Sequence, residues 1–564
     1  FTTPGSSWRD FDVSLISEGG GVFDRSAKEI VLSEQVKRML DVEADVMSGQ
    51  DLIRAVLSMP VDLLWNGGIG TYIKAEAEGH ADVGDGANDA VRVNATDVRA
   101  RIIGEGGNLG VTQLARIEYS RGGGRINTDF IDNSGGVDLS DHEVNLKILL
   151  QERVASGALT FDGRNELLAA MTDDVCDLVL HNNYRQSLAI SLAAPRSEAD
   201  PQLFYSLQEY LTERGDLDPR VEFLPTARQV QEMARNGQGY TRPELAVLMA
   251  YVKMGLYRRL LETDFPDERH FEHYLLDYFP GQLVERFRDA TLAHPLRREI
   301  VATQFTNKVV DLLGISFVHR TVRDTGATPV EIIRAALIAF EILDADDFVS
   351  AVFELDNRVS VDLQHRLLGR LVSAVEGLVN WIILSDLGRI PVDTFVSTYQ
   401  AQVRDLRLGL ERLLPAGPAA RFRAEKSELQ ALGLSMELAA DAVSFDYATT
   451  SPGVIEASRE TGLPLEATAS LFYELGERLA LPRLRKELLD LPVTSKWEKI
   501  GLGGIIMSLR NVQRRLTESA ALSGAESAGE FLDAHAGAVG RFERALDDVQ
   551  SAGELGFASA SVLN

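Results

Sequence analysis

The chain has 564 residues, enough for two or three domains. Its 84 acidic and 57 basic residues give a formal net charge of -27, which repels phosphate backbones and anionic lipid surfaces, so we expect neither nucleic acid nor a membrane as a partner. The single cysteine, Cys176, excludes an internal disulfide and a cysteine-only metal site and fits a reducing compartment, for which we expect the cytoplasm.

Short apolar runs alternate with helical stretches over the first 145 residues or so. We expect strands at residues 61–65, 101–103 and 127–131 and a helix at residues 51–59, which Ser48 can cap. The segment 76–94 is rich in Gly, Asp and Ala and is expected to form loops or one short helix. Such alternation is typical of a parallel α/β sheet.

From about Asp141 onward, apolar residues recur every three to four positions, which predicts helices. The clearest stripes cover residues 165–188, 242–261, 329–343, 363–384 and 496–516. Proline and glycine predict breaks at residues 195–201, 215–219, 265–267, 325–329, 415–418 and 451–453, and the end after about Ser551 is expected to fray. The predicted fold class is therefore α/β followed by all-α, with a first domain at residues 1–145 and a helical region at 146–564 that has room for two subdomains.

The segment 101–145 contains most of the chemical signal. Gly104, Gly106 and Gly110 follow an apolar run, but their spacing differs from the G-x-G-x-x-G fingerprint that opens a dinucleotide fold. Asn108 stands inside this turn, where its amide can both donate to and accept from a nicotinamide nucleotide. A turn asparagine that bonds its own backbone is the alternative interpretation.

Glycine and asparagine also follow the other two predicted strands. Asn66, Gly67 and Gly68 follow the first, and residues 133–136, which begin with Asn133, follow the third, so three strand ends could converge on one crevice. After the third, Ser140 or Asp141 is the expected N-cap of a helix. A free hydroxyl at a helix N-terminus suits a substrate carboxylate, although plain capping explains the same residues.

These motifs resemble the bacterial large NAD-dependent glutamate dehydrogenases, over Ser6 to about Leu150, and the helical remainder resembles their C-terminal region. Residues 103–108, Ile-Gly-Glu-Gly-Gly-Asn, stand where smaller glutamate dehydrogenases have an apolar residue followed by Ala-Glu-Gly-Ala-Asn. Residues 133–137, Asn-Ser-Gly-Gly-Val, followed by Ser140, are similar to Asn-Ala-Gly-Gly-Val with a serine seven residues after the asparagine. Glycine or serine replaces alanine in both motifs, and the 66–68 strand end differs from that of the small enzymes.

The resemblance implies the C-terminal part of a Rossmann-like NAD-binding domain. It implies that Asn108 contacts the nicotinamide half of NAD, and that Ser140 binds the side-chain carboxylate of L-glutamate, which is converted to 2-oxoglutarate and ammonium. It also implies that the cofactor cleft is lined by Gly67, Gly68, Gly106, Gly107 and Asn133. Self-association is common in such large enzymes and is expected here.

The family's catalytic lysine and acid–base group come from a preceding domain, so we assign no catalytic residue. Lys74 and Lys147 lack a motif that would make them substitutes, and capping or dipole roles suffice for Asp141, His142 and Glu143. Because the chain begins at Phe1 without an initiator Met, we interpret it as a fragment that has no dehydrogenase activity alone. Two alternatives stay open: a dehydrogenase of another amino acid, against which Ser140 argues, and a helical scaffold or regulatory region of a larger enzyme.

Overall fold

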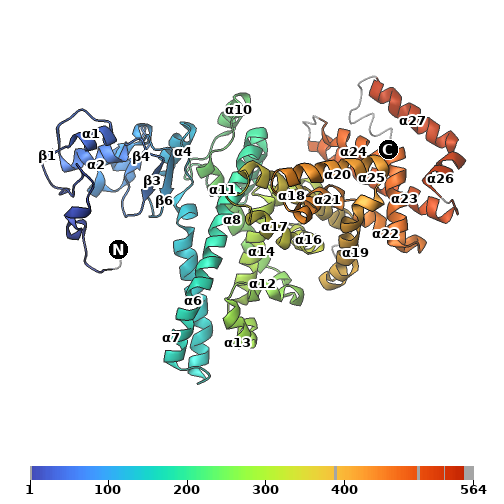
Figure 1. Cartoon of the computed structure of the whole chain (residues 1–564), viewed down its shortest axis with the longest axis horizontal. Coiled ribbons are helices and arrows are strands. Elements are labelled where there is room, and N and C mark those ends of the chain that lie inside the picture. Colours follow the sequence, from blue (N-terminus) through green and yellow to red (C-terminus); the bar gives the residue numbers. More distant parts are fainter. Residues whose placement is uncertain (1–2, 386–389, 492–495, 526, 552–564) are drawn as a thin grey trace. The chain divides into compact units, whose positions relative to one another are not determined.

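The structure, a computed structural model, describes residues 3–385, 390–491, 496–525 and 527–551. It is 70% helical. The chain forms two compact units, Phe1–Ser316 and Phe317–Asn564, each considered by itself below. Residue 145, near which the sequence predicts a domain boundary, lies within helix α6 (Ser134–Ala155) of the first unit (Figure 1).

The first unit begins with three pairs of short strands (Figure 1). Strands β3 (Leu63–Asn66) and β6 (Ile102–Glu105) are parallel, with Leu63 opposite Ile102. Strands β4 (Ile73–Lys74) and β5 (Val93–Asn94) are also parallel, whereas β1 (Ile30–Val31) and β2 (Val46–Met47) are antiparallel. The parallel pairs confirm that the chain starts as an α/β structure.

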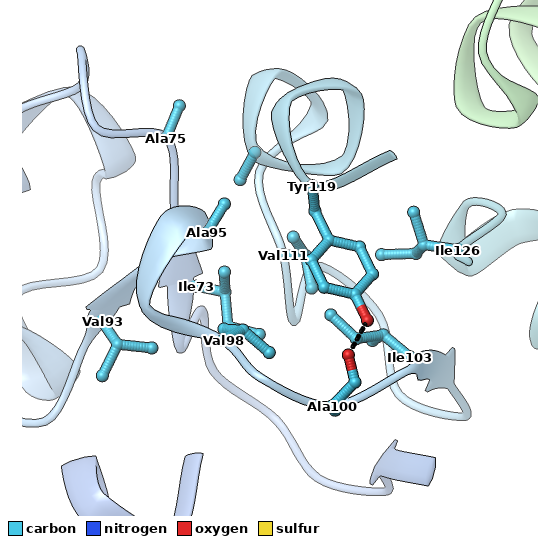
Figure 2. Packing of buried hydrophobic residues seen from close by; sticks show 11 residues of the cluster. Ile73, Ala75, Val93, Ala95, Val98, Ala100, Ile103, Val111, Tyr119 and Ile126 are labelled. Carbon is cyan, nitrogen blue, oxygen red and sulfur yellow. Dashed lines mark hydrogen bonds between the residues drawn. The ribbon is translucent and has the colours of Figure 1, made fainter. Parts of the chain in front are cut away.

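Helix α4 (Gln113–Arg121) lies beside β6 and closes the core of the α/β part. Its Tyr119 is buried and donates a hydrogen bond of 2.5 Å from its hydroxyl to the carbonyl of Ala100, just before β6 (Figure 2). Ile73, Val93 and Ile103 fill the same cluster from the strands. This packing holds the two parallel pairs and α4 together, so the ends of β3 and β6 have a fixed support.

The predicted strand at residues 127–131 is wrong. Residues Asp129–Asp132 form a helical turn, α5, and α6 begins directly afterwards at Ser134. The carboxylate of Asp132 accepts from the backbone N–H of Glu105 at 3.0 Å, and that of Asp129 accepts from the N–H of Leu109 at 2.8 Å. Short polar side chains that bond neighbouring backbone compete with strand pairing, which explains the difference.

The predicted cap at Ser48 and the predicted break at 195–201 concern helices α2 and α8. Helix α2 (Gly49–Leu57) is capped by Ser48, whose hydroxyl accepts from the N–H of Asp51, as predicted. The break predicted at 195–201 is wrong in part, because α8 (Thr172–Ala199) continues past Pro195 and ends only at Ala199. Buried Ser197 accepts a hydrogen bond of 2.7 Å from the N–H of Tyr240, so tertiary packing holds this last turn.

The remaining helices of the first unit confirm the helical periodicity, although the stripe at 165–188 is divided at Met171. The short ones before α6 are η1 (Trp8–Asp10), η2 (Val13–Leu15), α1 (Glu34–Leu40), α3 (His80–Val83), η3 (Gly86–Asn88) and η4 (Ala95–Asp97). Those after α6 are α7 (Phe161–Ala170), α9 (Pro201–Glu213), α10 (Ala227–Arg235), α11 (Arg242–Leu261), η5 (Phe265–Asp267), η6 (Arg269–Phe271), α12 (Glu272–Leu276), α13 (Gly281–Leu292) and α14 (Arg297–Leu313).

The described part of the second unit is helical. Its first helices are α15 (Phe317–Thr325), α16 (Pro329–Ile342), α17 (Ala345–Phe353), α18 (Val361–Leu384), α19 (Val392–Leu413), α20 (Ala416–Ala431) and α21 (Met436–Ala448). The others are α22 (Ser451–Thr461), α23 (Leu465–Arg478), α24 (Leu481–Leu489), α25 (Lys496–Leu522), α26 (Ala528–Ala534) and α27 (Ala536–Ser551). The residues after Ser551, where fraying is predicted, lie outside the described residues.

Helix α18 is long and apolar enough to cross a membrane by length and composition alone. In the structure 56% of its most apolar window is buried, and it packs against α16 and α21. This is the environment of a core helix.

Candidate functional site

The ends of β3 and β6 lie side by side because the two strands are parallel neighbours. The N–H of Gly107 donates to the carbonyl of Asn66 at 2.8 Å, which joins the loop after β6 to the end of β3. Two of the three predicted strand ends therefore meet. Gly67 and Gly68 belong to the first loop and Gly106 and Gly107 to the second, so the structure brings the two glycine pairs together.

Glycine is required where the two loops touch. A Cβ atom on Gly107 would lie 2.5 Å from the carbonyl oxygen of Gly68, and one on Gly110 would lie 1.5 Å from Nδ2 of Asn66. Nothing lies within 4 Å of a Cβ placed on Gly68, so that side of the loop is open. The glycines thus let the loops meet backbone to backbone and leave an open face.

Asn108 and Asn133 connect the two family-like motifs. Nδ2 of Asn133 donates to Oδ1 of Asn108 at 2.9 Å. Asn133 lies between α5 and α6, and a Cβ on Gly136 would come within 2.6 Å of its Oδ1, so the glycine makes room for this amide. Leu109 adopts a φ of 60°, which turns the chain sharply after Asn108.

A buried network of charged side chains supports the turn that contains Asn108. Glu105 is fully buried, and its carboxylate accepts from Nε and Nη2 of Arg116 at 2.7 and 2.9 Å. Arg116 also pairs with Asp129 at 3.2 Å, and Asp129 accepts from the N–H of Leu109. Burial raises the pKa of Glu105, opposed by the Arg116 guanidinium. The network ties the end of β6, helix α4 and α5 to the backbone beside Asn108. It is not among the features predicted from the sequence, where its signal is a Glu, an Arg and an Asp around one turn.

Ser140 is not a helix cap. Helix α6 begins at Ser134, so the predicted N-cap at Ser140 or Asp141 is wrong, and Ser140 lies in the second turn with its hydroxyl donating to the carbonyl of Gly136 at 3.3 Å. Its side chain is exposed. Ser140 follows Asn133 on the same helix and remains accessible to a ligand.

The other ionisable groups considered from the sequence are engaged elsewhere. His142 is buried, and its ring stacks on Tyr278 with 4.2 Å between centroids. Lys74 is buried and donates to Oδ1 of Asn94 at 2.5 Å, while Lys147 pairs with Glu143 one turn away. None of these three contacts joins the group at Asn108 and Asn133.

A cavity of about 440 Å³ adjoins the β3 loop. It is lined by Asn66, Gly68 and Gly110 together with apolar side chains of α2 and by Phe23 and Arg25 of the N-terminal segment. Nδ2 of Asn66 is buried there without a hydrogen-bond partner among the described residues. This cavity is not predicted from the sequence, because the segment before α2 carries no periodic signal.

Comparisons with known families agree with the motifs. Residues 1–193 match the model of the bacterial NAD-glutamate dehydrogenase catalytic domain, and residues 237–564 match that of the glutamate dehydrogenase C-terminal region. The chain belongs to the bacterial NAD-glutamate dehydrogenase family. Residue 145 therefore falls inside the matched catalytic domain, and the second unit inside the matched C-terminal region.

Relatives in three bacteria carry the name NAD-specific glutamate dehydrogenase. The proteins of Halomonas elongata and Pseudomonas aeruginosa are each 38% identical to this chain, over 99% and 100% of it, and that of Mycobacterium tuberculosis is 36% identical over 100%. The chain spans 35% of the length of each of these family members.

Proposed function

We propose that the chain is part of an NAD-dependent glutamate dehydrogenase, which oxidises L-glutamate to 2-oxoglutarate and ammonium and reduces NAD. The observation that carries this proposal is the hydrogen bond between Asn133 and Asn108, which joins the two family-like motifs at one place. Family membership supports the same reaction.

The amide pair fits the carboxamide of a nicotinamide. Among the described residues, Nδ2 of Asn108 and Oδ1 of Asn133 make no hydrogen bond to another side chain. Asn108 therefore offers a hydrogen-bond donor and Asn133 an acceptor, and together they complement the acceptor and the donor of the nicotinamide carboxamide. Bound there, NAD would accept hydride from the α-carbon of glutamate.

The remaining roles follow the same arrangement. Gly67, Gly68, Gly106 and Gly107 would line the cofactor cleft, where the missing side chains permit close approach of a ligand to the backbone. The exposed hydroxyl of Ser140 would donate to the side-chain carboxylate of glutamate. Among the described residues we assign no group that moves the proton of the substrate amine.

The proposal also covers the domain organisation, the self-association and the location of the enzyme. The parallel pair β3 and β6 would belong to a Rossmann-like NAD-binding domain within residues 1–145, followed by a helical region at 146–564. We further propose self-association and a cytoplasmic location. Sedimentation of the purified full-length protein and cell fractionation test these two points.

Substitutions at the two polar residues test the proposed function. In the full-length protein, Asn108→Ala should raise the KM for NAD about tenfold or more, because one uncompensated amide contact is lost. Ser140→Ala should raise the KM for glutamate by a similar factor and leave that for NAD unchanged.

Asn165→Ala, at an exposed position of α7, is the matched control, since it removes the same amide away from both motifs. Equal KM values for NAD in the Asn108→Ala and unsubstituted proteins would refute the assignment of Asn108. Unchanged glutamate kinetics in Ser140→Ala, with altered assembly, would favour a scaffold role.

A further inference from the structure

Two arginines of the helical unit lie at the contact between α24 and α25. The helices pack through an apolar cluster to which α24 contributes Leu484 and Leu488, and α25 contributes residues up to Leu509. Arg485 directly follows the first of these leucines and Arg510 the last. Both arginines therefore lie at the border of the apolar contact between α24 and α25.

Arg485 is held in place by a fixed partner. Its Nη1 donates to Oε1 of Gln513 at 2.6 Å, and Gln513 is itself buried and donates from Nε2 to the carbonyl of Phe472 at 2.9 Å. A Cβ on Gly476 would lie 2.4 Å from that Nε2, so this glycine makes room for the glutamine. The orientation of the Gln513 amide, and with it the position of the Arg485 head group, is set by the surrounding backbone.

Arg510 has no oxygen partner among the described residues. Its Nε is buried without a hydrogen bond, and its Nη1 reaches only the sulfur of Met507 at 3.8 Å. It lies three residues before Gln513 on α25, so Arg510 shares a helix face with the glutamine that binds Arg485, and both arginines lie at the same part of the α24–α25 contact. Burial, together with the Arg510 charge, lowers the pKa of Arg485 to about 10.

Neither arginine pairs with a carboxylate in the described part of the chain, although the chain has 84 acidic residues. The next arginine on α25, Arg514, shows the contrast: it pairs with Glu456 at 3.5 Å and with Glu518 at 2.9 Å. Two adjacent, half-buried positive charges without a counter-charge repel each other and lose hydration.

We propose that Arg485 and Arg510 form a binding site for a small oxyanion, a carboxylate or a phosphate group. A planar guanidinium offers parallel N–H donors that match two oxygens of such an anion, and two adjacent guanidiniums offer two such sets. The anion supplies the negative charge that the protein does not. Exchange of the anion with solvent requires access to the head groups, and Arg485 and Arg510 are both only partly buried.

Titration calorimetry of the full-length protein with inorganic phosphate and, separately, with succinate tests the site. Chloride keeps the ionic strength constant. We expect one of the two anions to bind with one equivalent per chain, and Arg510→Gln to weaken that binding about tenfold or more. Binding of phosphate would identify a phosphate site, and binding of succinate would identify a carboxylate site.

Arg515→Gln is the matched control, because it removes the same charge from an exposed position of α25. It should change the affinity less than twofold, and Arg510→Lys should retain part of the binding. Circular dichroism establishes that each variant keeps its helices; if Arg510→Gln unfolds, Arg485→Gln takes its place. Absence of binding by both anions, or equal affinity in the unsubstituted protein and the folded variant, would overturn the proposal.

Discussion

Glu105 is the residue on which the geometry beside Asn108 depends most. It stands in the glycine-rich turn, yet its carboxylate is fully buried and held by two hydrogen bonds from Arg116. Removal of one partner from a buried ion pair leaves the other charge uncompensated, which costs more than the pair contributes.

We therefore expect Glu105→Gln to lower the free energy of unfolding by about 3 kcal/mol. Glu143→Gln, which breaks the exposed pair with Lys147, should lower it by less than about 1 kcal/mol. Urea unfolding of the two variants measures the difference. Equal losses would mean that the buried network does not support the turn.

His142 makes stability depend on pH. Burial lowers its pKa below the ordinary value of 6.5, opposed by the charges of Asp138 and Asp141. In the folded protein both ring nitrogens lack a hydrogen-bond partner among the described residues, and the nearest oxygen of Asp138 is 3.8 Å away. The unfolded chain thus takes up a proton at a pH where the folded chain does not.

The free energy of unfolding should accordingly fall as pH falls below about 6.5, since there the unfolded state binds more protons. His142→Phe should make this slope shallower without abolishing it, because burial also lowers the pKa of His294. His181→Gln, at an exposed position of α8, is the control. A slope in His142→Phe identical to that of the unsubstituted protein would contradict the prediction.

At the scale of elements, the start of α6 decides where Asn133 points. Two glycines, Gly135 and Gly136, stand in its first turn, where alanine would favour the helix by about 0.5–1 kcal/mol. A Cβ on Gly135 would make an ordinary contact of 3.4 Å with Val179, whereas one on Gly136 would displace the amide of Asn133.

Gly136→Ala should therefore separate Asn133 from Asn108 and raise the KM for NAD several-fold, while Gly135→Ala should leave it unchanged. Steady-state kinetics of the full-length protein, at saturating glutamate, tests the pair. Equal effects of the two substitutions would show that the helix start, and not the Asn133 amide, matters.

The elements that the sequence predicts correctly are those with a local cause. The strands at 61–65 and 101–103 follow from apolar runs that end in glycine, and α11 from an uninterrupted 3.6-residue pattern. The strand predicted at 127–131 is wrong because the carboxylates of Asp129 and Asp132 accept hydrogen bonds from backbone N–H groups in another part of the chain. The burial of Glu105, and the lack of a carboxylate partner for Arg510 among the described residues, depend on tertiary packing, which no local pattern encodes.

At the scale of the whole molecule, the chain forms two compact units, each with an apolar core. The family-like motifs lie in Phe1–Ser316, while Phe317–Asn564 contains a helical core of its own around α16 and α18. A unit with its own apolar core can fold alone.

We expect a chain of residues 317–564 to be helical by circular dichroism and to unfold cooperatively with heat. The same chain with Val379→Asp, a charge at a fully buried position of α18, should lose this cooperativity. A gradual, featureless melt of the unsubstituted chain would show that this unit depends on the first.

The contact between the β3 and β6 loops has a consequence for evolution. A side chain at position 107 is tolerated only if the loop at position 68 moves, and a side chain at position 110 only if Asn66 gives way. We expect a substitution in one loop to be tolerated only together with a compensating change in the other. Among relatives, residues 66–68 and 106–110 should therefore be inherited as a pair, and a chimera that combines the loops of two distant relatives should be less stable than either parent.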